Sequence, residues 1–274
     1  MAFYPMPNDY ECGPFSLKYA MGLFGIFAYE KDISVLAGTS WWGGTDEFGL
    51  TRAARNYGFK LIHFFELTPA KAITKLNKYL SKYPCILAVN GWNHWITVAQ
   101  RLDDKYIIMD SGTTKVFNIY NQKQLLQSWV YIDDNTKTRF DGYLLIPKDE
   151  NLIKAKFKLE YIKLLNKKEN IKINHKWQEY YEDLSTICKT SSRLHSISFN
   201  EFIDQYSDEI IQSIVYWYGD VKKSELKNVL LGMKIVADVH QLRIKKEEIT
   251  KAIISITILL TLYACGKHGM VEIY

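Results

Sequence analysis

The sequence predicts an α+β domain followed by an all-α helical domain. Three observations predict this order. Helical periodicity dominates the chain up to residue 82, apolar β-rich runs follow one another up to Pro147, and proline is absent beyond it. Helices ahead of an antiparallel sheet are typical of an α+β domain, and a proline-free helical stretch is typical of a bundle. We therefore expect one domain at residues 1–147 and a helical bundle of unknown role at 148–274.

Composition excludes several classes of function. A hydrophobic content of 47% in 274 residues is ample for packed cores. The net charge of +5 is mild, and no aromatic-basic motif is present, which argues against nucleic-acid binding. The four cysteines are scattered without CxxC pairs, so neither a disulfide scaffold nor a metal site is indicated. We expect reduced thiols, a cytoplasmic location, and no metal or other cofactor.

Targeting and membrane signals are weak. The first residues lack the basic start and apolar run of a signal peptide. Residues 252–266 form an apolar run that is shorter than the roughly 20 residues of a membrane span, and the run contains Ser and Thr. A buried core helix is the better interpretation, so we expect no stable membrane span.

Local patterns predict each element in turn. Gly58 stands where a helix C-cap belongs, and Thr68 with Pro69 is typical of an N-cap followed by the first helical position. The expected elements before the sheet are helices at 13–27, 31–38 and 49–60, a strand at 61–67 and a helix at 68–82.

The remaining strands surround a hairpin signal, "LDDK", at residues 102–105. His63, inside the first strand, is expected to be a strand residue whose ring has a hydrogen-bond partner. The expected strands after the helices lie at 84–90, 94–102, 105–111 and 141–147, and the expected helices of the second domain lie at 151–166, 174–189, 199–217, 222–240 and 245–264.

Cys12 is the first candidate for chemistry. It precedes Gly-Pro at the start of a predicted helix, in "ECGPFSLKYA". The helix dipole and unpaired N–H groups at that position favour the thiolate, and the same N–H groups can hold an oxyanion. A lone cysteine is more often a small buried hydrophobe, so Cys12 alone decides nothing.

His94 and Asp110 change this balance. His94 begins a predicted strand, and Asp110 ends the next one. If "LDDK" makes the hairpin, the register brings Asp110 level with residues 95–98 and close to His94. Each residue alone has an ordinary structural explanation, but together they predict a nucleophile, a base and an orienting carboxylate.

These segments resemble a known family. "ECGPFSLKYAMGLFG", "GTDEFGLTRAARNYGFK" and "NHWITVAQRLDDKYIIMDSG" are similar to the papain-like peptidase domain of bacterial enzymes that process bacteriocins for export. That family cleaves leader peptides after a double glycine. The resemblance covers roughly residues 4 to 147 and implies a papain-like cysteine peptidase fold. It also implies that Cys12 is the nucleophile, His94 the base and Asp110 the orienting residue.

The chain departs from the family in two respects. The family has glutamine six residues before the cysteine, where its amide completes the oxyanion hole, but here that residue is Met6. A thioether cannot donate a hydrogen bond, so Asn8 is the candidate replacement. Family members are also commonly fused to a transmembrane exporter and an ATPase domain, and this chain has neither signal. The candidate substrate-groove residues are Trp41, Trp42, Trp92 and Trp95, although core packing explains them equally well.

Three functions remain open at this point. The leading hypothesis is a cysteine peptidase-like hydrolase of a peptide or isopeptide bond. A thiol acyltransferase with the same triad is the second, because the two reactions differ only in the nucleophile that resolves the thioester. A non-catalytic peptide-binding module is the third, and Met6 supports it. The expected partner is a peptide or acyl substrate, and the helical domain is a candidate docking module for a protein.

Overall fold

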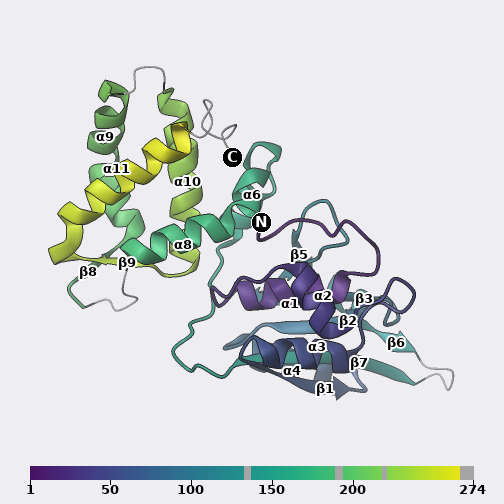
Figure 1. The fold of residues 1–274 in the computed structure, drawn as a ribbon. Coiled ribbons are helices and arrows are strands. Elements are labelled where there is room, and N and C mark those ends of the chain that lie inside the picture. Colours follow the sequence, from purple (N-terminus) through teal and green to yellow (C-terminus); the bar gives the residue numbers. More distant parts are fainter. Residues whose placement is uncertain (133–136, 189–193, 218–220, 266–274) are drawn as a thin grey trace. The chain divides into compact units, whose positions relative to one another are not determined.

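The computed structural model describes residues 1–132, 137–188, 194–217 and 221–265. It divides into two compact units, residues 1–175 and 176–274. Each unit is described by itself below, with the element labels of Figure 1.

Three helices cover one face of the first unit's sheet. They are α1 (Cys12–Gly22), α2 (Glu30–Ala37) and α3 (Glu47–Asn56). Their apolar faces meet Phe59, Ile86 and Leu145 of the sheet in one buried cluster. Helix α1 ends earlier than the predicted residue 27, because the chain turns at Gly25, whose φ is 75°. The helix predicted at 31–38 is confirmed, with Gly38 as its left-handed C-cap.

The sheet is antiparallel and has the strand order β1-β7-β2-β3-β4-β5, with β6 paired to β7 (Figure 1). Every strand predicted from the sequence is present. The strands are β1 (Phe59–Glu66), β2 (Cys85–Val89), β3 (His94–Leu102), β4 (Lys105–Met109), β5 (Phe117–Asn121), β6 (Tyr131–Ile132) and β7 (Thr138–Pro147). Strand β2 is buried on both faces, so alternate residues of its apolar run enter two different cores.

Two helices cover the opposite face. Helix α4 (Pro69–Leu80) has Thr68 as N-cap and Pro69 at its start, as predicted, but the Thr68 side chain makes no capping bond. Helix α5 (Gln122–Trp129) was not predicted, and neither were β5 and β6. Asn121 and Gln124 form a reciprocal capping box at the start of α5. Asn followed three residues later by Gln was the sequence signal for this helix.

The first unit extends beyond the predicted boundary at Pro147. Residues 151–158 are not helical; instead the amide N–H groups of Ala155 and Phe157 bond to Leu23 O and Gln100 Oε1 at 2.7 and 2.9 Å. Helix α6 (Leu159–Leu165) and helix α7 (Ile171–His175) follow. The main chain at residues 174–175 then accepts hydrogen bonds from the N–H groups of Phe3 and Ala2 at 3.1 and 3.2 Å. These bonds explain why the compact unit ends at residue 175.

The second unit is helical, as predicted, with one addition. Its helices are α8 (Trp177–Ile187), α9 (Phe199–Trp217), α10 (Lys223–Val239) and α11 (Ile249–Cys265). Short strands β8 (Ser196–Ser198) and β9 (Arg243–Lys245) pair with each other, and this pairing was not predicted. The core of the unit includes Trp177, Phe202, Leu226 and Ile256. The predicted fold class, an α+β domain followed by a helical region, is confirmed.

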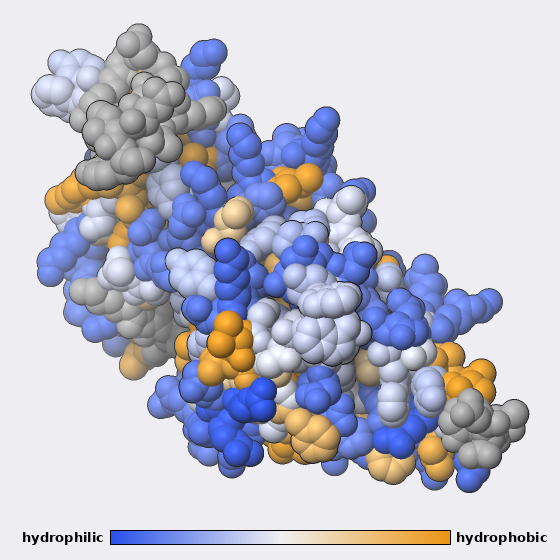
Figure 2. Space-filling view, turned by 45° about the vertical axis from the view of Figure 1, so that its right-hand side comes forward, coloured by the Kyte–Doolittle hydropathy of each residue, from blue (hydrophilic) through white to orange (hydrophobic). Residues whose placement is uncertain are grey.

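The surface is mixed in character. On the face drawn in Figure 2, hydrophobic side chains form small patches among hydrophilic ones. Helix α11, predicted to be a core helix, buries Ile256 and Leu260 but exposes Ile254, Ile258 and Leu262. Within the described ranges, none of the helices combines the length and the apolar content that a membrane crossing requires.

Candidate active site

Cys12 is the first residue of α1, and its side chain is 6% exposed. The amide N–H groups at a helix start have no partner within the helix, so those of Cys12 and Gly13 are suited to bind an oxyanion. Pro14 is tolerated here because the N–H that it lacks would have had no helical acceptor. The helix bonds begin with Phe15 N donating to Glu11 O at 3.1 Å.

The β3–β4 hairpin places His94 and Asp110 together. Asp103 adopts a φ of 54° in the predicted turn, and Thr97 pairs with Met109. Asp110 follows directly, so it stands level with the start of β3, as the predicted register requires. His94 Nε2 lies 2.7 Å from Asp110 Oδ1. This confirms the register, although it leaves the catalytic role of each residue as a proposal.

Asp110 is held from its own loop. Its side chain is almost fully buried, and Oδ1 also accepts the N–H of Gly112 at 2.8 Å. Its backbone N–H donates to Val116 O at 2.9 Å. The carboxylate therefore has a fixed position from which it can fix the orientation of the imidazole.

The pKa of His94 depends on both Asp110 and Cys12. Burial lowers the pKa of His94, but hydrogen bonds and charge interactions with Asp110 and Cys12 outweigh it and raise the pKa to about 9. Asp110 Oδ1 occupies Nε2 of this ring. At neutral pH this imidazole therefore carries a proton between a carboxylate and a sulfur atom. That arrangement can stabilise a thiolate and later deliver a proton to a leaving group.

The loop before β3 is conformationally unusual. Asn90, Gly91 and Trp92 have φ values of 55°, 68° and 68°. Left-handed conformations cost about 1 kcal/mol or more for residues other than glycine, so the surroundings must enforce them. Asn90 N donates to Ser128 O at 2.7 Å, and Asn93 Nδ2 donates to Asn90 O at 3.1 Å. These bonds fix the loop that leads into His94.

Met6 and Asn8 are the residues on which the predicted oxyanion donor depends. The N–H of Met6 donates to Ser111 O at 2.9 Å, which ties residue 6 to the loop that follows Asp110. Asn8 is exposed, and its Nδ2 donates to Glu11 Oε2 at 3.0 Å. One of the two N–H bonds of this amide is thus used next to the start of α1. Whether the other serves an oxyanion stays a prediction.

The four candidate groove tryptophans differ in their exposure and in the rings that they contact. Trp41 and Trp42 are each 75% exposed and pack edge to face at a ring distance of 5.5 Å. Trp92 stacks on Tyr131 at 4.6 Å, and Trp95 packs against Tyr143 at 5.6 Å. Core packing is therefore excluded for Trp41 and Trp42, whereas Trp95 is largely packed. Their contact with a substrate stays a prediction.

A row of side chains joins Trp95 to Trp92 along the sheet. The residues in order are Trp95, Tyr143, His63, Phe65, Arg139 and Trp92, with successive ring or cation–ring distances of 5.6, 4.9, 5.9, 4.7 and 5.4 Å. The prediction that His63 has a partner is confirmed, because its Nε2 lies 2.8 Å from Asp141 Oδ1. The row begins at Trp95, the residue after His94; Tyr143 in it is buried, whereas Phe65 and Trp92 are each 46% exposed.

Thr45 and Gly112 lie at the site but were not predicted from the sequence. An added methyl group at Gly13 would lie 2.8 Å from Thr45 Cβ, so Thr45 packs directly against the residue after Cys12. A methyl group at Gly112 would lie 3.1 Å from His94 Cε1 and 3.3 Å from Asp110 Oδ1. The sequence signals were the glycine after Cys12 and the Asp-Ser-Gly that ends β4, but neither reveals a partner distant in the sequence.

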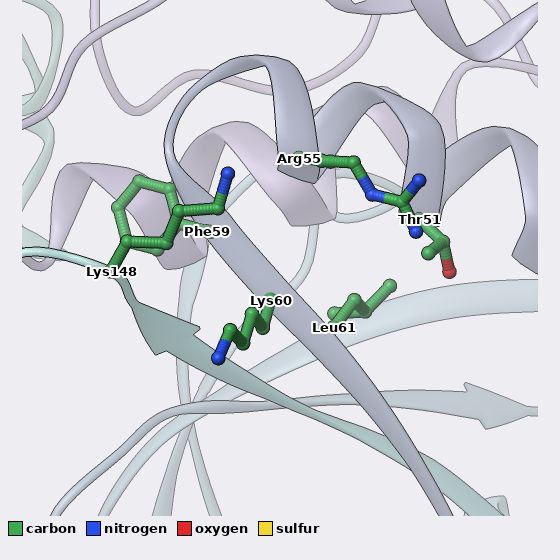
Figure 3. A pocket seen from close by; sticks show the side chains of 6 residues that line it. All are labelled: Thr51, Arg55, Phe59, Lys60, Leu61 and Lys148. Carbon is green, nitrogen blue, oxygen red and sulfur yellow. The ribbon is translucent and has the colours of Figure 1, made fainter.

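A pocket of about 330 Å³ lies away from these residues. Figure 3 shows its six lining side chains, which come from α3, β1 and the residue after β7. Phe59 pairs with Pro147 at one end of the sheet, whereas the strand ends near His94 are level with residues 140–142. The pocket is therefore at the opposite end of the sheet. Its lining residues are Thr51, Arg55, Phe59, Lys60, Leu61 and Lys148.

Gly112→Ala tests the packing around the imidazole. The new methyl group must push against His94 and Asp110 at distances tighter than ordinary contact. We expect alkylation of Cys12 by iodoacetamide near neutral pH to slow by about tenfold while the fold is kept, because the proton-bearing imidazole is displaced. The control is Gly43→Ala, whose methyl group meets only Ser40 Oγ, at 3.2 Å. Equal rates for the two variants would show that the glycine does not position His94.

Comparison with known proteins identifies relatives of the first unit. The family model described as "Peptidase C39 family" matches residues 4–133. The chain is 20% identical to a double glycine motif protease from an AMS/PCAT transporter, solved in complex with the leader peptide; the match covers 53% of this chain and 90% of that chain, with a TM-score of 0.41. No curated protein matches this chain.

Two further solved structures are similar. The peptidase domain of Streptococcus ComA, a bi-functional ABC transporter involved in a quorum sensing pathway, is 21% identical; the match covers 53% of this chain and 96% of that chain, with a TM-score of 0.41. The N-terminal peptidase C39 like domain of the toxin secretion ATP-binding protein from Vibrio parahaemolyticus is 14% identical; the match covers 52% of this chain and 98% of that chain, with a TM-score of 0.38.

Proposed function

With residues 4–133 assigned to the Peptidase C39 family, we propose that the chain is a cysteine peptidase that uses Cys12, His94 and Asp110. The observation that carries the proposal is the 2.7 Å contact between His94 Nε2 and Asp110 Oδ1, beside a cysteine that starts a helix. In keeping with this geometry, interactions with Asp110 and Cys12 outweigh burial and raise the pKa of His94 to about 9.

The proposed reaction begins with the thiolate of Cys12. Its sulfur attacks the carbonyl carbon of the peptide, and the carbonyl oxygen becomes an oxyanion against the N–H groups at the start of α1. The His94 imidazolium gives its proton to the nitrogen of the leaving amine, and the C–N bond breaks to leave a thioester. Asp110 keeps the His94 ring oriented while the charge of the ring changes.

The second half of the reaction resolves the thioester. Neutral His94 accepts a proton from water, and the resulting hydroxide oxygen attacks the thioester carbonyl. The C–S bond breaks, the acid product leaves, and the thiolate–imidazolium pair is restored. An acceptor amine in place of water would give acyl transfer from the same intermediate, which keeps acyltransferase as the alternative.

The proposed substrate is a peptide. The row from Trp95 to Trp92 supports this, because its exposed members Phe65 and Trp92 offer aromatic surface to a peptide, and the row begins at the residue after His94. By family, the scissile bond follows a double glycine. We propose a cytoplasmic setting, since Cys12, Cys85 and Cys188 are free thiols.

Cys12→Ala is the direct test. Peptides with a central Gly-Gly are incubated with wild type and variant, and the products are identified by mass spectrometry. We expect cleavage after the second glycine by wild type and none by the variant. Cleavage that persists in Cys12→Ala, or its absence in wild type when Cys12 still reacts selectively with iodoacetamide, would overturn the peptidase proposal.

Met6→Gln is expected to raise the rate. Residue 6 is tied to Ser111 beside the triad, so a glutamine amide there can supply the donor that methionine lacks. One oxyanion donor is worth about 100-fold in kcat, and we expect a gain approaching that value. Asn8→Ala is the paired variant, expected to slow wild type but not Met6→Gln if Asn8 is the present donor. No gain in Met6→Gln would show that residue 6 does not supply an oxyanion donor.

A further inference from the structure

Residues 39–45 form a small braced hairpin between α2 and α3. Ser40 and Gly44 exchange two backbone hydrogen bonds of 2.9 Å each, and Gly43 N donates to Ser40 Oγ at 3.1 Å. At the base, the hydroxyl groups of Thr39 and Thr45 are 2.7 Å apart. These bonds close the loop on itself, so its tip has a defined position.

The base of this hairpin touches the residues that follow Cys12 and His94 in the chain. The Thr45 side chain packs against Gly13, the residue after Cys12. The Thr45 carbonyl accepts the indole N–H of Trp95, the residue after His94, at 3.0 Å. Thr45 is itself buried. The hairpin is therefore anchored at the point where the nucleophile and the base meet.

The tip of the hairpin presents Trp41 and Trp42 to solvent. Each ring is 75% exposed, and they contact each other edge to face. Burial of large aromatic side chains is a main source of folding stability, but these two rings are exposed and contribute little to it. The fold does not require indoles here, because the hairpin is held by its backbone and its hydroxyl groups. Exposed paired aromatic rings beside a reactive centre are typical of a recognition surface.

We infer that Trp41 and Trp42 are specificity-determining residues that bind an apolar side chain of the peptide substrate near the scissile bond. This inference rests on the proposed peptidase function. The occupant is the substrate rather than another protein, because the anchor of the hairpin is continuous with Cys12 and His94 through Thr45. The hairpin that carries the two indoles is thus anchored against the residues after Cys12 and His94, and indole faces and edges accept aliphatic or aromatic groups.

The test uses a set of peptides with a central Gly-Gly and otherwise serine and alanine. A single leucine is moved through each flanking position on both sides, and kcat/KM is measured by competition and mass spectrometry. In wild type, we expect leucine at one or two positions to raise kcat/KM by about tenfold over the peptide without leucine. In the double variant Trp41→Ala, Trp42→Ala, that gain is expected to disappear.

The matched control is Trp217→Ala, which removes an indole of similar exposure, 77%, from the end of α9. It is expected to keep the leucine gain. Alkylation of Cys12 by iodoacetamide, a reagent too small to reach the indoles, reports whether the double variant keeps its thiol reactive. A leucine gain that survives in the double variant, or no leucine gain in wild type, overturns this inference alone. If wild type cleaves none of the peptides, the peptidase proposal fails and the inference fails with it.

Discussion

His94→Ala is expected to slow alkylation of Cys12 by iodoacetamide by about 100-fold near pH 6. In wild type, hydrogen bonds to Asp110 and Cys12 overcome the effect of burial and hold the pKa of His94 at about 9. The imidazolium therefore persists through the neutral range, and a positive charge beside a thiol favours the thiolate, the form that iodoacetamide alkylates. Mass spectrometry of each cysteine-containing peptide gives the rate at every thiol.

The other thiols and a second imidazole supply the controls. Burial raises the pKa of Cys85, and it raises that of Cys188 to about 12, so both should react slowly at every pH tested. The side chain of Cys265 lies outside the described residues. His63→Ala removes an imidazole that also meets a buried carboxylate, Asp141, at 2.8 Å. It should leave the Cys12 rate unchanged. If Cys12 in wild type is no faster than Cys188, the thiolate–imidazolium pair does not exist.

The second unit is expected to lose roughly 5 kcal/mol of stability as the pH falls from neutral to about 3. Burial lowers the pKa of His240 from 6.5 to about 3, and its Nε2 accepts the indole N–H of Trp177 at 3.0 Å. The unfolded chain binds this proton more readily than the folded one. The stability that neutral His240 contributes to the folded unit is thus complete above about pH 6.5, and it is lost between that value and about pH 3.

Urea titrations followed by far-UV circular dichroism measure this loss at a series of pH values. The variant His240→Gln keeps an acceptor for Trp177 but cannot titrate in this range. This variant is expected to be less stable than wild type near neutral pH. Its free energy of unfolding should change less with pH, because residue 240 no longer binds a proton. Parallel pH profiles for wild type and His240→Gln would show that His240 does not make the unit acid-sensitive.

The sequence predicted most of the first unit because its signals are local. The hairpin turn at residues 102–105 set the register of β3 and β4 near the turn, and a shift of one residue between Val98 and Gln100 then brings Asp110 to the start of β3 beside His94. Cys12 was recognisable because a helix start is visible in the residues around it. Helix α5 was missed although Asn121 and Gln124 carried a capping signal, since the short runs beside it lacked clear periodicity.

The parts that the sequence could not predict depend on distant contacts. Thr45 packs on Gly13, and the anchoring of residues 155–157 depends on Leu23 and Gln100, so no local pattern contains them. Residues 151–158 have the periodicity of a helix, but the bonds to Leu23 and Gln100 hold them extended. The compact unit therefore ends at residue 175 rather than at Pro147.

The hydrogen bonds between the first and last residues of the first unit affect the order in which this unit folds during synthesis. Ala2 and Phe3 donate to residues 174–175, and Met6 donates to Ser111. Contacts between residues so far apart in sequence form late, because a long loop must close before they do. A growing chain has Cys12, His94 and Asp110 available well before residue 175 emerges. Ala2 and Phe3, which bond to residues 174–175, are thus among the last residues of the first unit to reach their final places.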